Sequence, residues 1–394
     1  MKNDSIKLLK MFVCLTFSLL LINRVSSQSV HETVLWKTGE GNYKGYRIPS
    51  IIVSTKGTIL AFVEGRNDGD DSGDIDIVLK RSKNNGRTWE NERIVWDDSL
   101  NTCGNPCPVV DQQTGRIWLF MTWNDGKDHE NEIIRRTAKN TRIPYLCFSD
   151  DDGLSWSKPV NVSLACKDPN WGWYATGPGI GIQIKGGKYS GRLVIPANHS
   201  YGDPESKIRK DPHGYGSHVL ISDDHGKSWH MGSPIRPGCN ESQVVELSDG
   251  ALLMNMRSYN GKYCRAISYS HDGGETWSPV EHDYELVESV CQASILHYGK
   301  HKRNEFYLFS NPAVPIGRTH MTLKVSADNC GTWFASKLIY AGPSAYSCLV
   351  RLPNGRIGLL FEKGIISAYE TISFVALNVK DILGSGDNQI KNYP

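Results

Sequence analysis

The octapeptide SDDDGLSW, residues 149–156, decides the fold because variants of it recur along the chain. There are five copies in all, and the other four read SKNNGRTW (82–89), SDDHGKSW (222–229), SHDGGETW (270–277) and SADNCGTW (326–333). Their consensus is S-x-D-x-G-x-[ST]-W. Two copies depart from it, since Asn84 replaces the aspartate in the first copy and Cys330 replaces the glycine in the fifth.

The composition of the octapeptide predicts a turn between two strands of a hairpin. An Asp or Asn side chain accepts hydrogen bonds from nearby backbone N–H groups, and Gly permits turn geometries that other residues rarely adopt. The Trp then packs back onto the sheet as a large apolar anchor. Each copy follows a strand-like run, namely DIVLKRS, PYLCFS, SHVLIS, RAISYS and MTLKVS. The repeat is therefore structural, and the function has to be argued from other residues.

The spacing of the copies predicts the architecture. They begin 67, 73, 48 and 56 residues apart, which suits one four-stranded blade plus variable loops. Further strand-like runs lie between or after them, such as GRIWLFMTW, GRLVIPA, GALLMNM, NEFYLFS and GRIGLLFE. We expect an all-β, six-bladed β-propeller, with five blades that carry the octapeptide and a sixth closed by strands from both termini. Residues 28–394 form one domain in this interpretation.

The N-terminal segment resembles a secretory signal. Residues 1–27 combine a lysine-containing start, the apolar run MFVCLTFSLLLI (11–22) and small residues before a cleavage site near Ser27. An uncleaved anchor is the alternative, although the apolar run is short for a membrane span. No second run of spanning length follows. We therefore expect a secreted or otherwise extracytoplasmic protein without a membrane span after cleavage.

Composition and charge exclude several classes of function. The formal net charge is +2, so no global basic field favours binding to nucleic acid or to a membrane. The motif CGNPC (103–107) lacks a second Cys/His pair at metal-binding spacing, so we expect no zinc site. A local cluster of cations remains suited to an acidic small molecule.

Several motifs, in order along the chain, resemble those of the exo-α-sialidases (neuraminidases) of glycoside hydrolase family 33. The octapeptides match that family's Asp boxes, and YRIP (46–49) matches its first arginine motif. The resemblance extends from about Trp36 to Leu377 and is closest to bacterial-type catalytic domains. It implies release of terminal sialic acid from glycoproteins, gangliosides and sialyl-oligosaccharides, without a cofactor.

The substrate of that family carries a carboxylate on the anomeric carbon, and arginine binds carboxylates in a bidentate manner. The resemblance implies three such arginines, which are Arg47 in YRIP, Arg257 in LLMNMRSY and Arg318 in PIGRTHMTLKVS, with Arg303 as a nearby competitor for the third. Glu362 in LLFEKG falls where the family holds a carboxylate against the first arginine. Glu64 could share this task, because a buried cation requires a partner.

An acidic loop supplies the candidate acid. In VEGRNDGDDSGDID (63–76), the resemblance implies that Arg66 binds the O4 side of the sugar and that Asp71 protonates the leaving oxygen. Asp70 is the direct competitor for the acid. A calcium loop or a solvated turn is the alternative for the whole segment, but the closing Glu of an EF-hand is missing. Activity should favour mildly acidic pH, since the acid must begin the cycle protonated.

The resemblance also implies a tyrosine nucleophile, which the sialidases use in place of a carboxylate. A carboxylate attacking a carbon that bears a carboxylate would meet like-charge repulsion, and a neutral phenol avoids it. Its ordinary pKa of about 10 requires a nearby base. The resemblance assigns Tyr346 in AYSCLVRLPNGRIGLLFE as nucleophile and Glu241 in CNESQVVEL as base. In NWGWYATG (170–177), aromatic side chains either line the pocket or pack in the core.

Three functions remain open on these residues. The first is a retaining exo-α-sialidase that forms a covalent sialyl-tyrosine intermediate. The second is a trans-sialidase, including an intramolecular one, which uses the same fold and residues with a different acceptor. The third is a non-catalytic carbohydrate-binding propeller, which would not need the acid, tyrosine and glutamate together.

Overall fold

The computed structural model describes residues 32–68, 70–202, 214–301 and 304–384. The signal peptide expected at residues 1–27 lies outside this range. The described chain is nearly all strand, with short helical segments α2 (Glu130–Arg135), α3 (Ser163–Cys166), η1 (Gly187–Tyr189) and α4 (Val379–Leu383). None of the helices in the described ranges is long and apolar enough to cross a membrane.

The strands form four hydrogen-bonded sheets. One contains β2 (Gly45–Val53), β3 (Ile59–Arg66), β4 (Ile75–Ser82), β5 (Arg93–Trp96), β6 (Thr102–Val110), β7 (Ile117–Asn124), β8 (Ile143–Ser149) and β9 (Val160–Asn161). The next contains β10 (Tyr174–Thr176), β11 (Ile182–Gln183), β12 (Leu193–Ser200), β13 (Tyr215–Ser222) and β14 (His230–Met231). A third contains β15 (Cys239–Glu246), β16 (Leu252–Ser258), β17 (Cys264–Ser270) and β18 (Glu281–Val287). The last contains β19 (Ser294–His301), β20 (Asn304–Pro312), β21 (Thr319–Ser326), β22 (Ala335–Arg351), β23 (Ile357–Lys363), β24 (Thr371–Leu377) and β1 (Glu32–Lys37).

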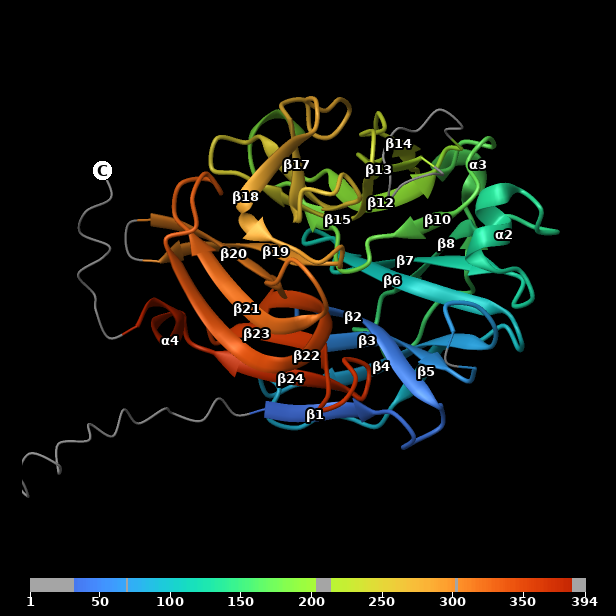
Figure 1. Ribbon diagram of the computed structural model, residues 1–394, viewed down its shortest axis with the longest axis horizontal. Helices are drawn as coiled ribbons and strands as arrows, with labels where there is room; N and C mark the ends of the chain where they lie inside the picture. The colour runs from blue at the N-terminus through green and yellow to red at the C-terminus, as the bar shows by residue number, and fades with distance from the viewer. Residues whose placement is uncertain (1–31, 69, 203–213, 302–303, 385–394) are drawn as a thin grey trace, which may run out of the picture. The chain divides into compact units, whose positions relative to one another are not determined.

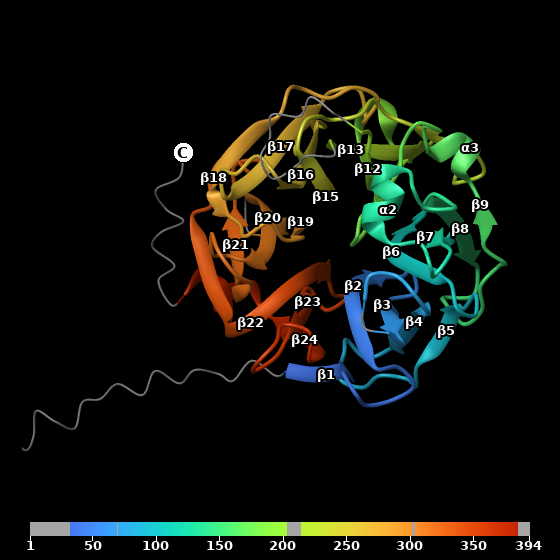
Figure 2. The same ribbon diagram turned by 45° about the vertical axis from the view of Figure 1, so that its right-hand side comes forward.

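These sheets follow one another around a ring (Figure 1), and the chain returns to its start at β1 and β24 (Figure 2). Sequential strands pair antiparallel almost throughout, and one parallel contact, Ile75 with Thr102, joins β4 to β6. The long strand β22 pairs with β21 through its first half and with β23 through its second half. β1 pairs with β24, so strands from both ends of the described chain close the ring, as the sequence predicted.

The strands expected directly before the octapeptides are confirmed as β4, β8, β13, β17 and β21. In each octapeptide the first Ser accepts the N–H of the fifth residue at 2.8–3.1 Å. The Asp or Asn at the third position accepts the N–H of the seventh residue at 2.9 Å. The side chain thus closes the turn, as its composition predicted.

The turn requires positive φ at its fifth position. Gly226 has φ +85°, and a Cβ there would lie 2.2 Å from the indole of Trp118. Cys330, which replaces this glycine in the fifth copy, adopts φ 65° and is buried. The fifth turn therefore keeps the shape of the others without glycine, in a region that disfavours side chains.

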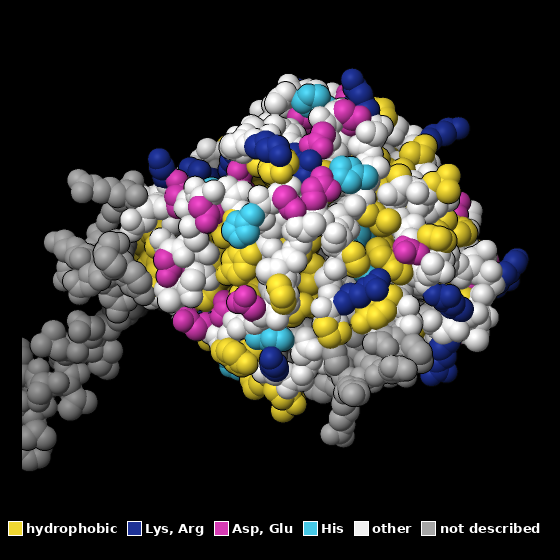
Figure 3. Space-filling view, turned by 90° about the horizontal axis from the view of Figure 1, so that it is seen from above, with side chains coloured by type: hydrophobic (Ala, Val, Ile, Leu, Met, Phe, Trp, Pro, Cys, Tyr) yellow, Lys and Arg dark blue, Asp and Glu magenta, His cyan; other side chains and the backbone are white. Residues whose placement is uncertain are grey.

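On the face shown in Figure 3, the described acidic and basic side chains are interspersed. This distribution agrees with the small net charge of +2.

Candidate active site

A pocket of about 500 Å³ collects most of the residues that the sequence selected. It is lined by residues of β2, β3, β6, α2, β10, β12, β15, β16 and β22 and of the loops between them. The predicted site residues among its lining are Arg47, Arg66, Asp71, Glu241, Arg257, Arg318 and Tyr346. Glu362 is not part of the lining and lies behind Arg47. Residues more than 250 positions apart in the chain therefore meet at one place because the sheets close into a ring.

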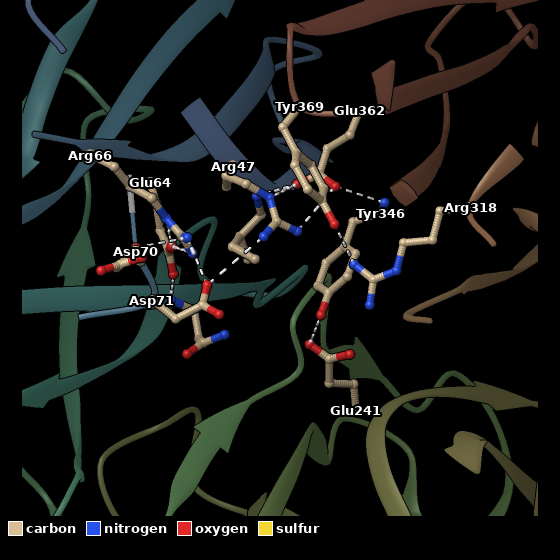
Figure 4. Close-up of polar contacts among 12 residues, drawn as sticks. Arg47, Glu64, Arg66, Asp70, Asp71, Glu241, Arg318, Tyr346, Glu362 and Tyr369 are labelled. Atoms are coloured by element: carbon tan, nitrogen blue, oxygen red, sulfur yellow. Dashed lines mark hydrogen bonds and ion pairs between the residues drawn. The ribbon is translucent and has the colours of Figure 1, made fainter. Parts of the chain in front are cut away.

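Arg47 lies on an irregular stretch of β2 and pairs with Glu362 (Figure 4). The register of β2 against β3 shifts between Arg47 and Ser50, and Ile48 adopts φ 60°, which is unusual for a β-branched residue. Glu362 Oε1 accepts the Ile48 N–H at 3.0 Å and the Arg47 Nε–H at 2.9 Å. Its Oε2 accepts from Arg47 Nη2 at 3.2 Å. The fully buried Glu362 thus holds both the backbone and the side chain of the first arginine.

Arg66, at the end of β3, pairs with two carboxylates. Its Nε donates to Glu64 Oε2 at 2.8 Å, so Glu64 partners Arg66 and not Arg47. Its Nη1 donates to Asp71 Oδ1 at 2.6 Å and to the backbone carbonyl of Asp70 at 2.9 Å. Asp71 Oδ1 also lies 3.8 Å from Arg47 Nη1. Asp71 therefore presents its carboxylate to the arginines, while Asp70 contributes its carbonyl.

Tyr346, in β22, donates a hydrogen bond to Glu241, in β15. Tyr346 Oη lies 2.6 Å from Glu241 Oε1, and both side chains are buried. Arg257 Nη1 donates to Glu241 Oε2 at 2.7 Å and to Tyr346 Oη at 3.2 Å. The Tyr346 N–H in turn donates to Glu362 Oε2 at 3.0 Å. A phenol, a carboxylate and a guanidinium are thus connected at the floor of the pocket.

Arg318 completes the group of cations around Tyr346. Its guanidinium carbon lies 5.6 Å from the Tyr346 ring centroid, and that of Arg47 lies 5.1 Å from it. Arg318 Nη1 donates to Tyr369 Oη at 2.8 Å. The competing candidate, Arg303, lies outside the described residues.

The charges of the pocket shift the pKa values of the two reactive groups. Desolvation raises the pKa of Asp71, but the guanidinium groups of Arg66 and Arg47 outweigh it and leave the pKa below its usual value. Burial raises the pKa of Tyr346 well above its usual value, and Glu241 raises it further, against the opposing effect of Arg257. These shifts favour the carboxylate form of Asp71 and the neutral phenol form of Tyr346 at neutral pH, so the protonated Asp71 that could act as an acid becomes more abundant at lower pH.

Comparison with known proteins identifies the family. The family model for the BNR repeat-like domain matches residues 57–359. The sialidase of Bacteroides fragilis is 32% identical over 373 residues, which are 88% of this chain and 64% of that protein. The exo-alpha-sialidase of Aspergillus fumigatus is 31% identical over 384 residues, which are 89% of this chain and 88% of that protein. The chain belongs to the sialidase family.

A solved structure of another sialidase, the Hadza microbial sialidase Hz136, has 32% sequence identity and a TM-score of 0.77. The similarity covers 89% of this chain and 69% of that one. Sialidases are glycoside hydrolases with a β-propeller fold, so the expected fold family is confirmed. The chain spans only 64% of the length of its Bacteroides fragilis relative.

Sequence reasoning missed several residues that line the sialidase pocket. Among them are Asn105, Glu130, Arg142, Tyr259 and Tyr369. Arg142 donates to neutral acceptors, which are Thr122 Oγ1 at 3.0 Å, Asn124 Oδ1 at 2.6 Å and Asn105 Oδ1 at 2.7 Å. One signal was present, because RIP at 142–144, at the start of β8, repeats the RIP at 47–49 within β2.

The aromatic segment 170–177 divides between pocket and core. Trp173 lines the pocket and lies 4.4 Å under the guanidinium of Arg142. Trp171 instead stacks on the buried ring of His199, and Tyr174 is fully buried. Trp173 therefore lines the pocket, whereas Trp171 and Tyr174 pack in the core.

Among the described residues no cluster of His, Cys, Asp and Glu has a geometry that could hold a metal ion. The acidic loop carries Asp71 on Arg66, and its Asp76 accepts a hydrogen bond from Tyr43 Oη at 2.6 Å. These two carboxylates therefore accept hydrogen bonds from protein side chains, Arg66 and Tyr43.

Proposed function

We propose that this sialidase-family protein is a secreted, retaining exo-α-sialidase that acts on the terminal sialic acid of glycoproteins, glycolipids and oligosaccharides. One observation carries the proposal. Tyr346 Oη lies 2.6 Å from Glu241 Oε1 in a pocket that is also lined by Asp71 and by the three arginines Arg47, Arg257 and Arg318. A non-catalytic carbohydrate-binding propeller would not require this joint arrangement of acid, nucleophile and base.

The three arginines bind the sugar carboxylate. Arg47 in β2, Arg257 in β16 and Arg318 in the loop before β21 approach Tyr346 from different parts of the chain. An anion held among them places the anomeric carbon near the phenol oxygen. Guanidinium groups remain charged at every working pH and match carboxylate geometry. Glu362 and Glu241 hold two of these side chains in place before substrate arrives. Little reorganisation is then needed on binding.

The first half-reaction forms a covalent intermediate. Tyr346 Oη attacks the anomeric carbon and gives its proton to Glu241, which lies within hydrogen-bond distance. The bond to the glycosidic oxygen breaks, and Asp71 gives that oxygen a proton so that the aglycone leaves as an alcohol. The burial that keeps Tyr346 neutral makes the base necessary, because a free phenolate would not form at this site.

The second half-reaction returns the enzyme to its starting state. Asp71, now a carboxylate, accepts a proton from water as the water oxygen attacks the anomeric carbon. The bond to Tyr346 breaks, and the phenol oxygen takes back the proton from Glu241. Two displacements at one carbon give net retention of configuration. A sugar hydroxyl in place of water would make the enzyme a trans-sialidase.

We assign the strands to six four-stranded blades, with the octapeptides at five outer turns. In support, β2–β5, β6–β9 and β15–β18 are consecutive antiparallel runs, and β22 divides between two neighbouring runs. Secretion rests on the signal-like composition of residues 1–27.

The substitution Tyr346→Phe tests the nucleophile. It removes only the phenol oxygen, so we expect loss of turnover of a fluorogenic sialoside with an unchanged melting temperature. Tyr298→Phe is the matched control, since the Tyr298 hydroxyl donates to the Gly355 carbonyl outside the pocket. Normal turnover by Tyr346→Phe would refute the assignment.

Product analysis separates hydrolysis from transfer. Proton NMR of the reaction with sialyl-lactose should show α-sialic acid as the first product, before it equilibrates with the β-anomer. Sialylated lactose formed from added acceptor, or an anhydro sugar, would instead indicate the trans-sialidase alternatives.

A further inference from the structure

Two loops beside the pocket expose large apolar side chains. Ile316, in the loop between β20 and β21, has a relative exposure of 80%. Ile365 and Ile366, in the loop between β23 and β24, have exposures of 84% and 91%. We refer to these three residues as the isoleucine rim. Exposed isoleucines on loops that leave one end of a sheet form a larger apolar surface than a single exposed side chain.

Strand pairing places the two loops side by side. In β22, Pro343 pairs with Thr319 on one side, and Ser344 pairs with Lys363 on the other. The loops that end at Thr319 and begin after Lys363 thus leave the sheet at the same end. The hydrogen bond from Arg318 Nη1 to Tyr369 Oη, at 2.8 Å, joins them at the pocket wall.

The second loop is held in a fixed shape that turns its isoleucines outward. The Glu370 carboxylate accepts three successive backbone N–H groups, those of Ile365 at 3.0 Å, Ile366 at 2.7 Å and Ser367 at 2.8 Å. Ala368 is buried in the same apolar cluster as Tyr346. The loop is therefore anchored beside the proposed nucleophile, and exposure of its tip requires no rearrangement.

The isoleucine rim borders the side of the pocket where the aglycone leaves. The Arg47 guanidinium lies 4.1 Å from the Tyr369 ring centroid and 3.8 Å from Asp71 Oδ1 (Figure 4). Tyr369 belongs to the isoleucine-bearing loop, so only one guanidinium separates this loop from the proposed acid. Whatever is attached to the glycosidic oxygen must pass close to this rim.

We infer that the isoleucine rim docks the enzyme on a lipid surface, so that sialic acids of glycolipids enter the pocket. The inference rests on the proposed sialidase function and names the form in which the substrate is presented. The backbone N–H groups of Ile365, Ile366 and Ser367 are already occupied by Glu370, which leaves apolar side chains as the main contact. Apolar side chains insert at a lipid interface, and with these N–H groups occupied the loop cannot bind a peptide by strand addition. The cations of the pocket, including Lys44 and Arg47, suit an anionic glycolipid headgroup.

The double variant Ile365→Ser/Ile366→Ser tests the docking by activity. We expect kcat/KM on ganglioside-containing phosphatidylcholine vesicles to fall about tenfold, since two apolar side chains lose their lipid contact. Activity on soluble sialyl-lactose should not change. Leu164→Ser is the matched control, because Leu164 is a fully exposed apolar residue in α3, which lies away from β23 and β24 in both ribbon views.

The outcomes of this assay separate the possibilities. Unchanged activity on both substrates, or an equal loss on both, would overturn the inference. An equal loss on vesicles and on a soluble sialylated glycoprotein would also overturn it, in favour of a general aglycone contact.

Vesicle co-sedimentation of Tyr346→Phe, with and without the two isoleucine substitutions, tests docking independently of turnover. Weaker binding of the triple variant to both ganglioside-containing and plain phosphatidylcholine vesicles supports docking, and equal binding contradicts it. If the wild-type enzyme had no activity on any sialoside, the proposed function would be wrong. The co-sedimentation result would still show whether the isoleucine rim binds a lipid surface.

Discussion

At the scale of single residues, the pocket is organised by pairs in which a carboxylate holds a cation. Glu362 holds Arg47, Glu64 holds Arg66, and Glu241 connects Arg257 to Tyr346. The pairing offsets the cost of burying charge, and it leaves the arginines oriented toward the pocket. Asp71 differs from the other carboxylates because its side chain is 63% exposed. An exposed carboxylate on a loop is suited to exchanging protons with a substrate and with water.

The protonation state of Asp71 determines how activity depends on pH. Its pKa is lowered by Arg66 and Arg47, so the protonated form that the first step needs becomes more abundant as pH falls. We expect kcat/KM on sialyl-lactose to fall as pH rises above the lowered pKa of Asp71, from the acidic range onward. A sialoside with a nitrophenol leaving group should show a weaker dependence, because its oxygen departs without a proton. Asp71→Asn should slow sialyl-lactose hydrolysis by roughly 10²–10⁴-fold and remove the difference in pH dependence.

The effect of pH on stability has the opposite sign. A lowered pKa in the folded state means that the ion pair with Arg66 stabilises the fold above the pKa of the unfolded chain and is lost as pH falls through the folded value. The contribution to stability is small because Asp71 is largely exposed.

The activity prediction has a clear contradicting outcome. Identical pH–rate profiles for the wild type and Asp71→Asn would exclude Asp71 as the acid, and the same test on Asp70→Asn would then be decisive.

At the scale of elements, the octapeptide turns fix the outer ends of the strands. Each turn uses a Ser and an Asp or Asn to satisfy backbone N–H groups, and it places a residue of positive φ against a neighbouring side chain. In the third copy this neighbour is Trp118, which belongs to β7 and donates its indole N–H to the His225 carbonyl at 3.0 Å. The turn therefore connects two adjacent runs of strands as well as closing its own hairpin.

A pair of glycine substitutions measures this role. Gly226→Ala places a Cβ 2.2 Å from the Trp118 ring at φ +85°, so we expect a loss of about 2–4 kcal/mol of unfolding free energy. Gly250→Ala has a similar φ of +87° with no atom within 4 Å of the added Cβ, so only backbone strain of about 1 kcal/mol is expected. Urea denaturation of both variants gives the comparison. Equal losses of unfolding free energy in the two variants would show that the contact with Trp118 does not contribute to stability.

The sequence predicted these elements well because each carries a local signal. The expected strand runs GRIWLFMTW, GRLVIPA, GALLMNM, NEFYLFS and GRIGLLFE fall on β7, β12, β16, β20 and β23. The pocket was predicted only where a motif marks a residue, as YRIP marks Arg47. Glu130 was missed because it lies in α2, a single short helix without a detectable period. Tyr259 was missed although it ends the motif LLMNMRSY that marks Arg257. Tyr369 was missed because its position depends on ring closure, which brings distant loops together.

At the scale of the whole molecule, the ring closes through β1. This strand pairs with β24, and its Trp36 is buried against the next run of strands. The Trp36 ring centroid lies 6.2 Å from that of Tyr46, and Nε1 donates to Glu92 Oε2 at 2.7 Å. Arg47 directly follows Tyr46 in β2, so closure of the ring and placement of the first arginine depend on the same packing.

Truncation of Trp36 tests whether closure stabilises the fold. Trp36→Ala should lower the unfolding free energy by about 3–5 kcal/mol, since it removes a buried aromatic side chain. Val34→Ala, in the same strand but half exposed, should cost about 0.5 kcal/mol or less. Thermal unfolding followed by circular dichroism gives both values. A small effect of Trp36→Ala would mean that β1 contributes little to the closed ring.

The central claim is that Tyr346 carries the sugar in a covalent intermediate. A sialosyl fluoride with a second fluorine beside the anomeric carbon tests it most directly, because fluoride leaves without acid assistance and the second fluorine slows hydrolysis. After reaction, digestion and mass spectrometry should locate the adduct on the phenol oxygen of Tyr346, and Tyr346→Phe should remain unlabelled. An adduct on another residue such as Glu241, or sialic acid released from sialyl-lactose with inverted configuration, would contradict the account.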